Sequence, residues 1–277
     1  MFFRCFGKIE ARATVLCLHG GPGWTHDYLL PLVDLTRFGF RVVLYDQSGC
    51  GKSEKTDATE RLTMAHAVAE VEEVRKNLRL GRIFLMGSSW GGMLALAYSL
   101  QHQDHLRGLI VSSGLASVPL ATREMQRLKR SLPKRILSAL EHYESRSEYD
   151  NTEYLKAVQV FYRRHLCRLK SWPAELVYSI NHLNRTIYNT MSGPNEFTCT
   201  GTLRDWDITS ELGTIRVPTL ITVGRFDEIT PLVSREMQSR IKDSRLVVFQ
   251  HSSHLAMWEE REKYIGILSN FMEGVLA

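Results

Sequence analysis

A Gly-x-Ser-x-Gly motif between a short apolar run and a helical pattern constrains the fold of this chain more than any other feature. Residues 83–86 are typical of a buried strand, and a helical pattern begins at Met93. Between them, Gly87-Ser88-Ser89-Trp90-Gly91-Gly92 predicts a sharp strand-to-helix turn, where glycines avoid collisions and Ser89 stands out of the sheet. A helix N-terminus there favours negative charge on a substrate oxygen, so Ser89 is a candidate nucleophile.

Short apolar runs alternate with longer helical patterns, which predicts an α/β fold with a mostly parallel sheet and helices on both faces. Residues 63–80 indicate an amphipathic helix with Thr63 as its N-cap and Gly81 as its stop. The predicted strands are residues 14–18, 41–45, 83–86, 108–111, 219–223 and 246–249.

The alternation stops after Leu115 and resumes at Pro218, and the residues between them show helical spacing. We therefore predict a helical cap at 115–204, inserted between two parts of an α/β core at 1–114 and 205–277. Residues 115–190 hold 13 basic and 7 acidic side chains, in a chain of net charge +5. No nucleic-acid motif accompanies them, which favours solvated helix faces over an acidic partner or nucleic acid.

A second glycine-rich segment, His19-Gly20-Gly21-Pro22-Gly23, follows the predicted strand 14–18. Glycine lets the backbone approach a ligand closely, so the amide of Gly21 can pair with the amide of Trp90 to bind a tetrahedral oxyanion. A simple Gly/Pro turn is the alternative. His19 precedes Ser89 in the chain, and we interpret it as a residue that orients this loop.

A third segment, Asp46-Gln47-Ser48-Gly49-Cys50-Gly51-Lys52-Ser53, ends like a nucleotide-binding P-loop. The P-loop pattern demands glycine where Asp46 stands, so we reject nucleotide binding. The turn is predicted to support the site, with Asp46 a poor candidate for the catalytic acid.

The catalytic acid is expected on a loop after a strand that follows the nucleophile. Asp227 follows the predicted strand 219–223 and meets this condition. Its rivals, Asp205 and Asp207, precede that strand. Asp227 is therefore the predicted residue that orients the catalytic histidine.

The catalytic histidine is expected after the last strand, where two histidines stand three residues apart. His254 lies deeper in the loop, just before the final helix, whereas His251 is closer to the strand. Spacing favours His254 as the general base and leaves His251 as the alternative.

The composition predicts no metal, no cofactor and no membrane span. The chain has neither an HExxH motif nor a Cys/His ligand set. Its five cysteines are odd in number and form no CxxC, which favours a reducing compartment. No apolar run is long enough for a membrane span or a signal segment, so we expect a cytoplasmic protein.

Together these segments resemble the proline iminopeptidases, serine aminopeptidases of the α/β-hydrolase fold, and among them most closely the tricorn-interacting aminopeptidase factors. The resemblance covers nearly the whole chain, and its last segment strengthens His254 as the base. It rests on residues 19–23, 46–53, 87–92, the Gly-x-x-Asp at 224–227 and Ser253-His254-Leu255-Ala256-Met257-Trp258-Glu259.

In one respect the chain departs from this family, whose members typically have two strands before the HGGPG segment. Only eighteen residues precede His19. We expect Met1 to Arg4 to be the remainder of the second strand and the first N-terminal strand to be missing.

The resemblance also implies a role for two glutamates. In the family, one glutamate in the segment matching residues 193–198 and another directly after the catalytic Asp bind the free α-amino group of the substrate; here they are Glu196 and Glu228. An α-amine with a pKa of about 8 is mostly charged at neutral pH, so two carboxylates would attract it. From the residues alone, either could be an ordinary loop carboxylate. We expect the adjacent Asp227 and Glu228 side chains to diverge, one toward His254 and one toward the pocket.

The leading hypothesis is a serine aminopeptidase that releases N-terminal residues, proline among them, from short peptides with a free N-terminus. An esterase or amino-acid amidase with the same triad is one alternative, and a catalytically silent binding protein on the same scaffold is another. We expect a monomer whose helical cap roofs the pocket and which acts downstream of a larger protease, with no nucleic-acid or membrane partner. No motif encodes which N-terminal residue is preferred.

Overall fold

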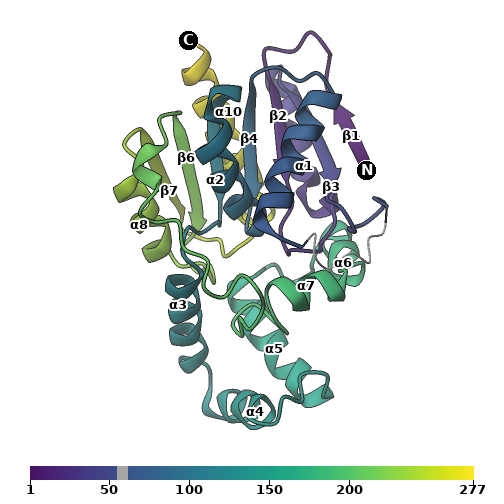
Figure 1. Ribbon diagram of the computed structural model, residues 1–277. Coiled ribbons are helices and arrows are strands. Elements are labelled where there is room, and N and C mark those ends of the chain that lie inside the picture. Colours follow the sequence, from purple (N-terminus) through teal and green to yellow (C-terminus); the bar gives the residue numbers. More distant parts are fainter. Residues whose placement is uncertain (55–61) are drawn as a thin grey trace.

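The core of the protein is a seven-stranded sheet in the order β1-β3-β2-β4-β5-β6-β7 (Figure 1). The computed structural model describes residues 1–54 and 62–277. β1 runs antiparallel to β3, and all other neighbouring pairs are parallel, which confirms the predicted α/β class. Every predicted strand is present. The strands are β1 (Phe2–Phe6), β2 (Thr14–Leu18), β3 (Arg41–Asp46), β4 (Ile83–Ser88), β5 (Leu106–Ser112), β6 (Thr219–Gly224) and β7 (Ser244–Phe249).

The N-terminal residues form an edge strand, as expected for the remainder of a second strand. β1 pairs with β3 from Phe2 opposite Asp46 to Phe6 opposite Val42. The backbone amide of Phe2 also donates to the Ser53 hydroxyl at 2.8 Å. Among the described residues, no strand precedes β1. The edge strand is thus tied to the turn that follows β3.

Helices cover both faces of the sheet because its strands are apolar on both sides. Successive side chains of a strand point to opposite faces, so Val15 and Cys17 belong to one core and Leu16 and Leu18 to the other. The first core is shared with η1 (His26–Phe38) and α10 (Arg261–Leu276). The second is shared with α1 (Met64–Asn77), α2 (Trp90–His102) and α8 (Pro231–Arg240).

Helix α1 begins where the sequence predicts and ends earlier. The Thr63 hydroxyl accepts from the amide of His66 at 3.2 Å, which confirms Thr63 as the N-cap. The helix stops at Asn77 rather than at Leu80, because Arg79 takes a left-handed backbone conformation with φ of 52°. The predicted stop at Gly81 therefore lies beyond the true end.

Five α-helices lie between β5 and β6 and gather beyond one end of the sheet (Figure 1). Apolar side chains of four of them form a third core together with Met93 of α2 and Ile229, which follows β6, whereas Leu176, in the fourth helix along the chain, belongs to the first core. The division of the chain at 114/115 and 204/205 stays a prediction. The five helices are α3 (Val118–Arg130), α4 (Lys134–Glu144), α5 (Thr152–His165), α6 (Ala174–Asn181) and α7 (Arg185–Met191).

The remaining described elements are short, and they connect the layers. None of the helices in residues 1–54 and 62–277 has the length and apolar character that a membrane span requires. These short elements are η3 (Gln103–His105), η4 (Leu212–Thr214) and α9 (Ala256–Glu259).

Candidate active site

Ser89 lies at the sharp turn between β4 and α2, as the motif predicts. Its φ of 57° and ψ of −122° are unusual for a residue with a side chain, and such backbone strain is concentrated at functional sites. The turn is held by the amide of Ser89, which donates to the carbonyl of Ser112 at 3.0 Å. A Cβ atom at Gly87 would overlap the Gly91 carbonyl, and one at Gly91 would overlap the Leu18 carbonyl. The glycines are therefore required by the turn.

His254 and Asp227 form a buried pair at the ends of neighbouring strands. The His254 Nδ1 lies 2.7 Å from the Asp227 Oδ1, and both side chains are almost wholly buried. The same carboxylate oxygen accepts from the amide of Ile229 at 2.8 Å, which fixes its orientation. The structure thus brings together the acid and the base that the sequence order selects.

The rival residues lie elsewhere. Asp205 is exposed and pairs with Arg204 at 3.1 Å. Asp207 accepts from the Ser117 hydroxyl at 2.6 Å and so joins two loop segments. His251 is exposed, and its amide donates to Glu260. These contacts account for the three residues without a catalytic role.

A small cavity is lined by four of the predicted site residues. Ser89, His254, Gly21 and Glu196 line it together. Burial alone would lower the pKa of His254, but the Asp227 carboxylate, with Glu228 and Glu196, outweighs burial and raises it to about 9. The cluster of acids therefore favours the protonated imidazole that forms during proton transfer.

Gln47 forms hydrogen bonds to both segments that carry the predicted oxyanion donors, Gly21 and Trp90. Gln47 Oε1 accepts from the Trp90 indole at 2.9 Å, and its Nε2 donates to the His19 carbonyl at 2.8 Å. Its amide also donates to the His19 Nε2 at 3.0 Å. Gln47 is buried, and the sequence reasoning did not assign it a role, because its partners lie far away in the chain.

His19 orients this loop, as predicted. Its Nδ1 lies 2.9 Å from the Gly20 carbonyl, and burial lowers its pKa to about 4. A neutral ring that donates through Nδ1 can accept the Gln47 amide at Nε2. The next amide, that of Gly20, donates to the Tyr28 hydroxyl at 2.7 Å. Gly21 follows with a φ of 111°, which favours glycine.

Asp46 has the supporting role that the sequence indicates. Its Oδ1 accepts from the amide and the Nδ1 of His26, at 2.8 and 2.7 Å, and its Oδ2 accepts from the amide of Lys52 at 2.8 Å. These bonds tie the start of η1 to the turn after β3.

The two glutamates both lie near His254, Glu196 in the same small cavity and Glu228 beside its ring. The Glu196 Oε1 accepts from the Tyr188 hydroxyl at 2.7 Å, and burial raises the pKa of this carboxyl. Glu228 is 1% exposed, and its Oε1 lies 3.8 Å from the His254 Nδ1. Its side chain therefore does not diverge from that of Asp227 as expected, because both approach the same ring nitrogen.

Glu228 holds a buried carboxylate oxygen without a hydrogen-bond partner among the described residues. Burial, and then the charge of Glu196, raises the pKa of Glu228 well above its ordinary value. An unpaired buried carboxylate is costly, and a cation placed between these two glutamates would relieve the cost. The site is thus prepared for a positive group.

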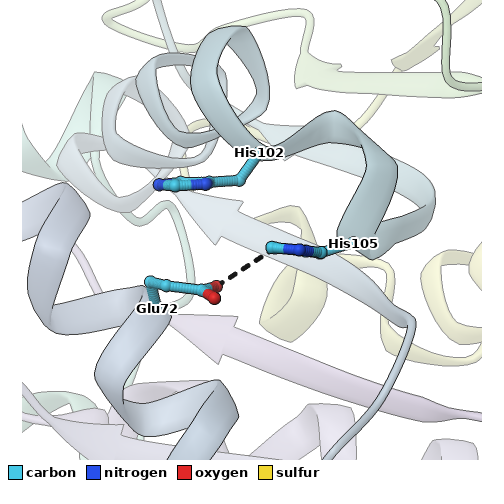
Figure 2. Close-up of side chains that lie close together, drawn as sticks. All are labelled: Glu72, His102 and His105. Atoms are coloured by element: carbon cyan, nitrogen blue, oxygen red, sulfur yellow. Dashed lines mark ion pairs between the residues drawn. The ribbon is translucent and has the colours of Figure 1, made fainter.

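A separate cluster of Glu72, His102 and His105 joins α1 to the end of α2 (Figure 2). Their nearest ligand atoms lie within 4.8 Å of one another. Both oxygens of Glu72, however, already accept from Arg75, at 2.7 and 2.8 Å, and one also accepts from the Tyr98 hydroxyl at 2.6 Å. With a guanidinium on the carboxylate, we interpret the cluster as a charge network between helices.

Comparison with known proteins agrees with the fold. The model of the α/β-hydrolase fold family matches residues 13–261, so the chain is an α/β hydrolase. A proline iminopeptidase of Thermoplasma volcanium is 51% identical over 276 residues, covering 99% of this chain and 93% of the relative. The chain therefore belongs to the proline iminopeptidase family, as its sequence motifs indicate.

Two further relatives support this assignment. A proline iminopeptidase of Saccharolobus solfataricus is 46% identical, with 99% of this chain and 89% of the relative covered. The crystal structure of a proline iminopeptidase from Mycobacterium smegmatis superposes with a TM-score of 0.93 at 32% identity, covering 99% and 94% of the two chains. The likeness thus extends over the helices between β5 and β6 as well as the sheet.

Proposed function

We propose that this protein is a serine aminopeptidase that releases N-terminal residues, proline among them, from short peptides. The observation that carries this proposal is that Glu196 lines a small cavity together with Ser89 and His254, while the Glu228 Oε1 lies 3.8 Å from the His254 Nδ1. A hydrolase site with two buried acids selects a substrate with a charged amine. The names of its close relatives point to the same activity.

The residues divide the reaction between them. Ser89 attacks the first peptide carbonyl while His254 removes its proton, and Asp227 holds the imidazole in the required tautomer. The amides of Gly21 and Trp90 bind the oxyanion. His254 then gives the proton to the leaving nitrogen as the C–N bond breaks. Water, activated by the same histidine, hydrolyses the acyl-enzyme and restores Ser89.

The amine is bound at a fixed distance from the nucleophile. With the ammonium between Glu196 and Glu228, only the first carbonyl of a peptide can reach Ser89, which limits cleavage to one residue. The ammonium also neutralises acids that hold the His254 pKa high, so substrate binding releases the neutral base that catalysis needs. Amine recognition and base activation are thus one event.

The released residue has its own cavity. A space of about 60 Å³ next to Ser89 is lined mainly by apolar side chains, among them Met93, Leu115, Met125 and Ile229. Its size and character suit a small apolar side chain such as a proline ring.

The cap and the setting of the protein belong to the same proposal. Residues 115–204 act as a cap that restricts substrates to short peptides, the kind that a larger protease releases. All five cysteines are free, which supports a cytoplasmic location. We expect a monomer, because the site draws every residue from one chain.

The experiment compares aminoacyl-p-nitroanilides, including proline, with their N-acetylated forms and with p-nitrophenyl esters. We expect turnover only with a free amine, and loss of activity in Ser89→Ala. Better turnover of blocked substrates or simple esters would favour an esterase and contradict the proposal. A fluorophosphonate probe that fails to label Ser89 would favour a silent binding protein.

A further inference from the structure

The last residue of α5, His165, contacts both loops that carry the catalytic pair. These loops follow β6 and β7, and they hold Asp227 and His254. His165 belongs to neither loop, because α5 lies between β5 and β6. The reaction steps use neither its ring nor its backbone, so its contacts need another reason.

The backbone carbonyl of His165 accepts from one amide in each loop. The amide of His254 donates to it at 3.1 Å, and the amide of Glu228 donates to it at 3.3 Å. The last carbonyl oxygens of a helix have no partner within the helix, and each has two lone pairs, so this oxygen can accept both amides. One helix end thus connects the acid loop to the histidine loop.

The imidazole of His165 adds a third hydrogen bond, to the acid loop. Its Nδ1 lies 2.8 Å from the carbonyl oxygen of Phe226, the residue before Asp227. A carbonyl oxygen only accepts, so Nδ1 carries the proton. That carbonyl belongs to the planar peptide that joins Phe226 to Asp227, so the bond sets the position from which the Asp227 side chain begins.

We propose that His165 is a positioning residue of the catalytic pair, whose imidazole N–H holds the Phe226 carbonyl and thereby keeps the Asp227 carboxylate on the His254 ring. The inference rests on the proposed function, because it takes Ser89, His254 and Asp227 as the reacting groups. It goes beyond that function by giving the end of α5 a task in catalysis.

Packing holds the His165 ring in the orientation that this bond needs. The centroid of the ring lies 4.8 Å from that of Phe161, four residues earlier in α5. Phe161 in turn packs edge-on against Phe197, with 4.8 Å between the ring centroids. Phe197 directly follows Glu196, so these rings connect the catalytic pair to the segment of the predicted amine-binding carboxylate. Burial also lowers the pKa of His165, which favours its neutral form.

The segment after α5 supports the same two loops. The Arg168 Cζ lies 3.7 Å from the centroid of the Phe226 ring, and the Arg168 amide donates to Glu259 at 2.7 Å. Glu259 also accepts from the amide of Ser253, the residue before the catalytic histidine, at 2.6 Å. These contacts and the backbone bonds of His165 remain when only its ring is changed. Loss of the ring N–H should therefore displace the pair slightly rather than unfold the loops.

The test separates the N–H donor of His165 from the packing of its ring. His165→Phe keeps a ring against Phe161 and loses the donor. His165→Asn loses the ring and keeps an N–H near the position of Nδ1, since both nitrogens are bonded to Cγ. The readouts are kcat for prolyl-p-nitroanilide and the rate constant for labelling of Ser89 by a fluorophosphonate. Both should fall about tenfold in His165→Phe, as for a small displacement of reacting groups, and stay within about threefold of the wild type in His165→Asn.

His182→Phe is the matched control. His182 lies at the end of another helix, α6, and its Nδ1 is 2.9 Å from the Tyr178 carbonyl, but this histidine is exposed and its partner belongs to its own helix. The substitution should leave both rates unchanged. Urea denaturation checks that each variant is folded under the assay conditions. If phenylalanine does not fit at position 165, His165→Ala against His165→Asn gives the same comparison.

Two results would overturn the role of His165. One is a wild-type rate of labelling and turnover in His165→Phe, or in His165→Ala where that variant replaces it. The other is an equal loss in His165→Asn, because packing rather than the donor would then account for the effect.

The labelling rate separates this inference from the proposed function, because a fluorophosphonate has no amine. If the wild type is labelled but cleaves no substrate with a free amine, the aminopeptidase function fails, and the labelling rates of the variants still decide the role of His165. If the wild type is not labelled, Ser89 is not an activated nucleophile, and both proposals fail.

Discussion

Two buried His–Asp pairs in this protein have the same geometry and different surroundings. In both, the imidazole Nδ1 lies 2.7 Å from a carboxylate Oδ1, with His254 on Asp227 and His26 on Asp46. Distance and burial therefore do not distinguish a catalytic pair from a supporting one.

The difference lies in what surrounds each pair. Asp46 is saturated by the backbone amides of His26 and Lys52, and the His26 ring packs 5.6 Å from the ring of Phe2. His254 instead lines a cavity with Ser89. A pair that faces open space next to a nucleophile can transfer a proton, whereas a pair enclosed by backbone and an aromatic ring holds two segments together.

The strongest test of the difference between the two pairs makes the same substitution, Asp to Asn, in each acid. Asp227→Asn should lower kcat about 10⁴-fold, because the amide favours the wrong imidazole tautomer. Asp46→Asn should leave kcat within about tenfold and lower the free energy of unfolding by about 1–3 kcal/mol, because an amide has one acceptor oxygen for three donors. Steady-state kinetics and urea denaturation measure both. Equal losses of kcat in the two variants would show that the pairs do not differ in function.

A smaller loss of kcat is expected for a substitution of Gln47, which connects the turn after β3 to the segments of the oxyanion donors. Gln47→Ala removes the bonds that hold Trp90 and His19, and it should lower kcat about tenfold to hundredfold, less than complete loss of an oxyanion donor. KM should change little, since the amine site is untouched. Gln101→Ala, at an exposed position of α2, is the control. A rise in KM at unchanged kcat would contradict a positioning role.

The smallest effect concerns the charge around the catalytic pair. Catalysis requires neutral His254, whose pKa is about 9, and a charged substrate amine, whose pKa is about 8, so kcat/KM should follow a bell-shaped pH profile with His254 on its rising side. The negative charge of Glu228 favours the protonated ring, so Glu228→Gln should move this rise to lower pH. Glu262→Gln, on the surface, should leave the profile where it was. An unshifted rise in Glu228→Gln would mean that the charge of Glu228 does not act on His254.

The sequence predicts most of the fold because the strands carry a strong local signal. A strand such as β2 is buried on both faces, so every one of its residues is apolar or small, and its length and flanking turns set it apart from a helix. The sequence also predicts the turn at Ser89, since the glycines at 87 and 91 are needed to avoid backbone overlap. The order of serine, acid and histidine then selects Asp227 and His254.

What the sequence could not predict depends on contacts between distant residues. Gln47 is hydrogen-bonded to Trp90, 43 positions away, and the residues next to Gln47 in the chain do not indicate that partner. Glu70 looks like any polar position of an amphipathic helix until Ser48 is placed beside it. The approach of Glu228 to His254 likewise depends on side-chain rotamers. A search for polar residues at positions of α1 predicted to be buried would have singled out Glu70.

The shared core of the cap and the sheet has a mechanical consequence. Met93, in the first turns of the helix behind the nucleophile, and Ile229, two residues after Asp227, are both packed among cap side chains. An outward movement of these helices would remove apolar contacts from the segments that hold Ser89 and Asp227 in place. We therefore expect the helices between β5 and β6 to stay packed on the sheet while the site is assembled. On heating, the two parts should unfold as a single cooperative unit.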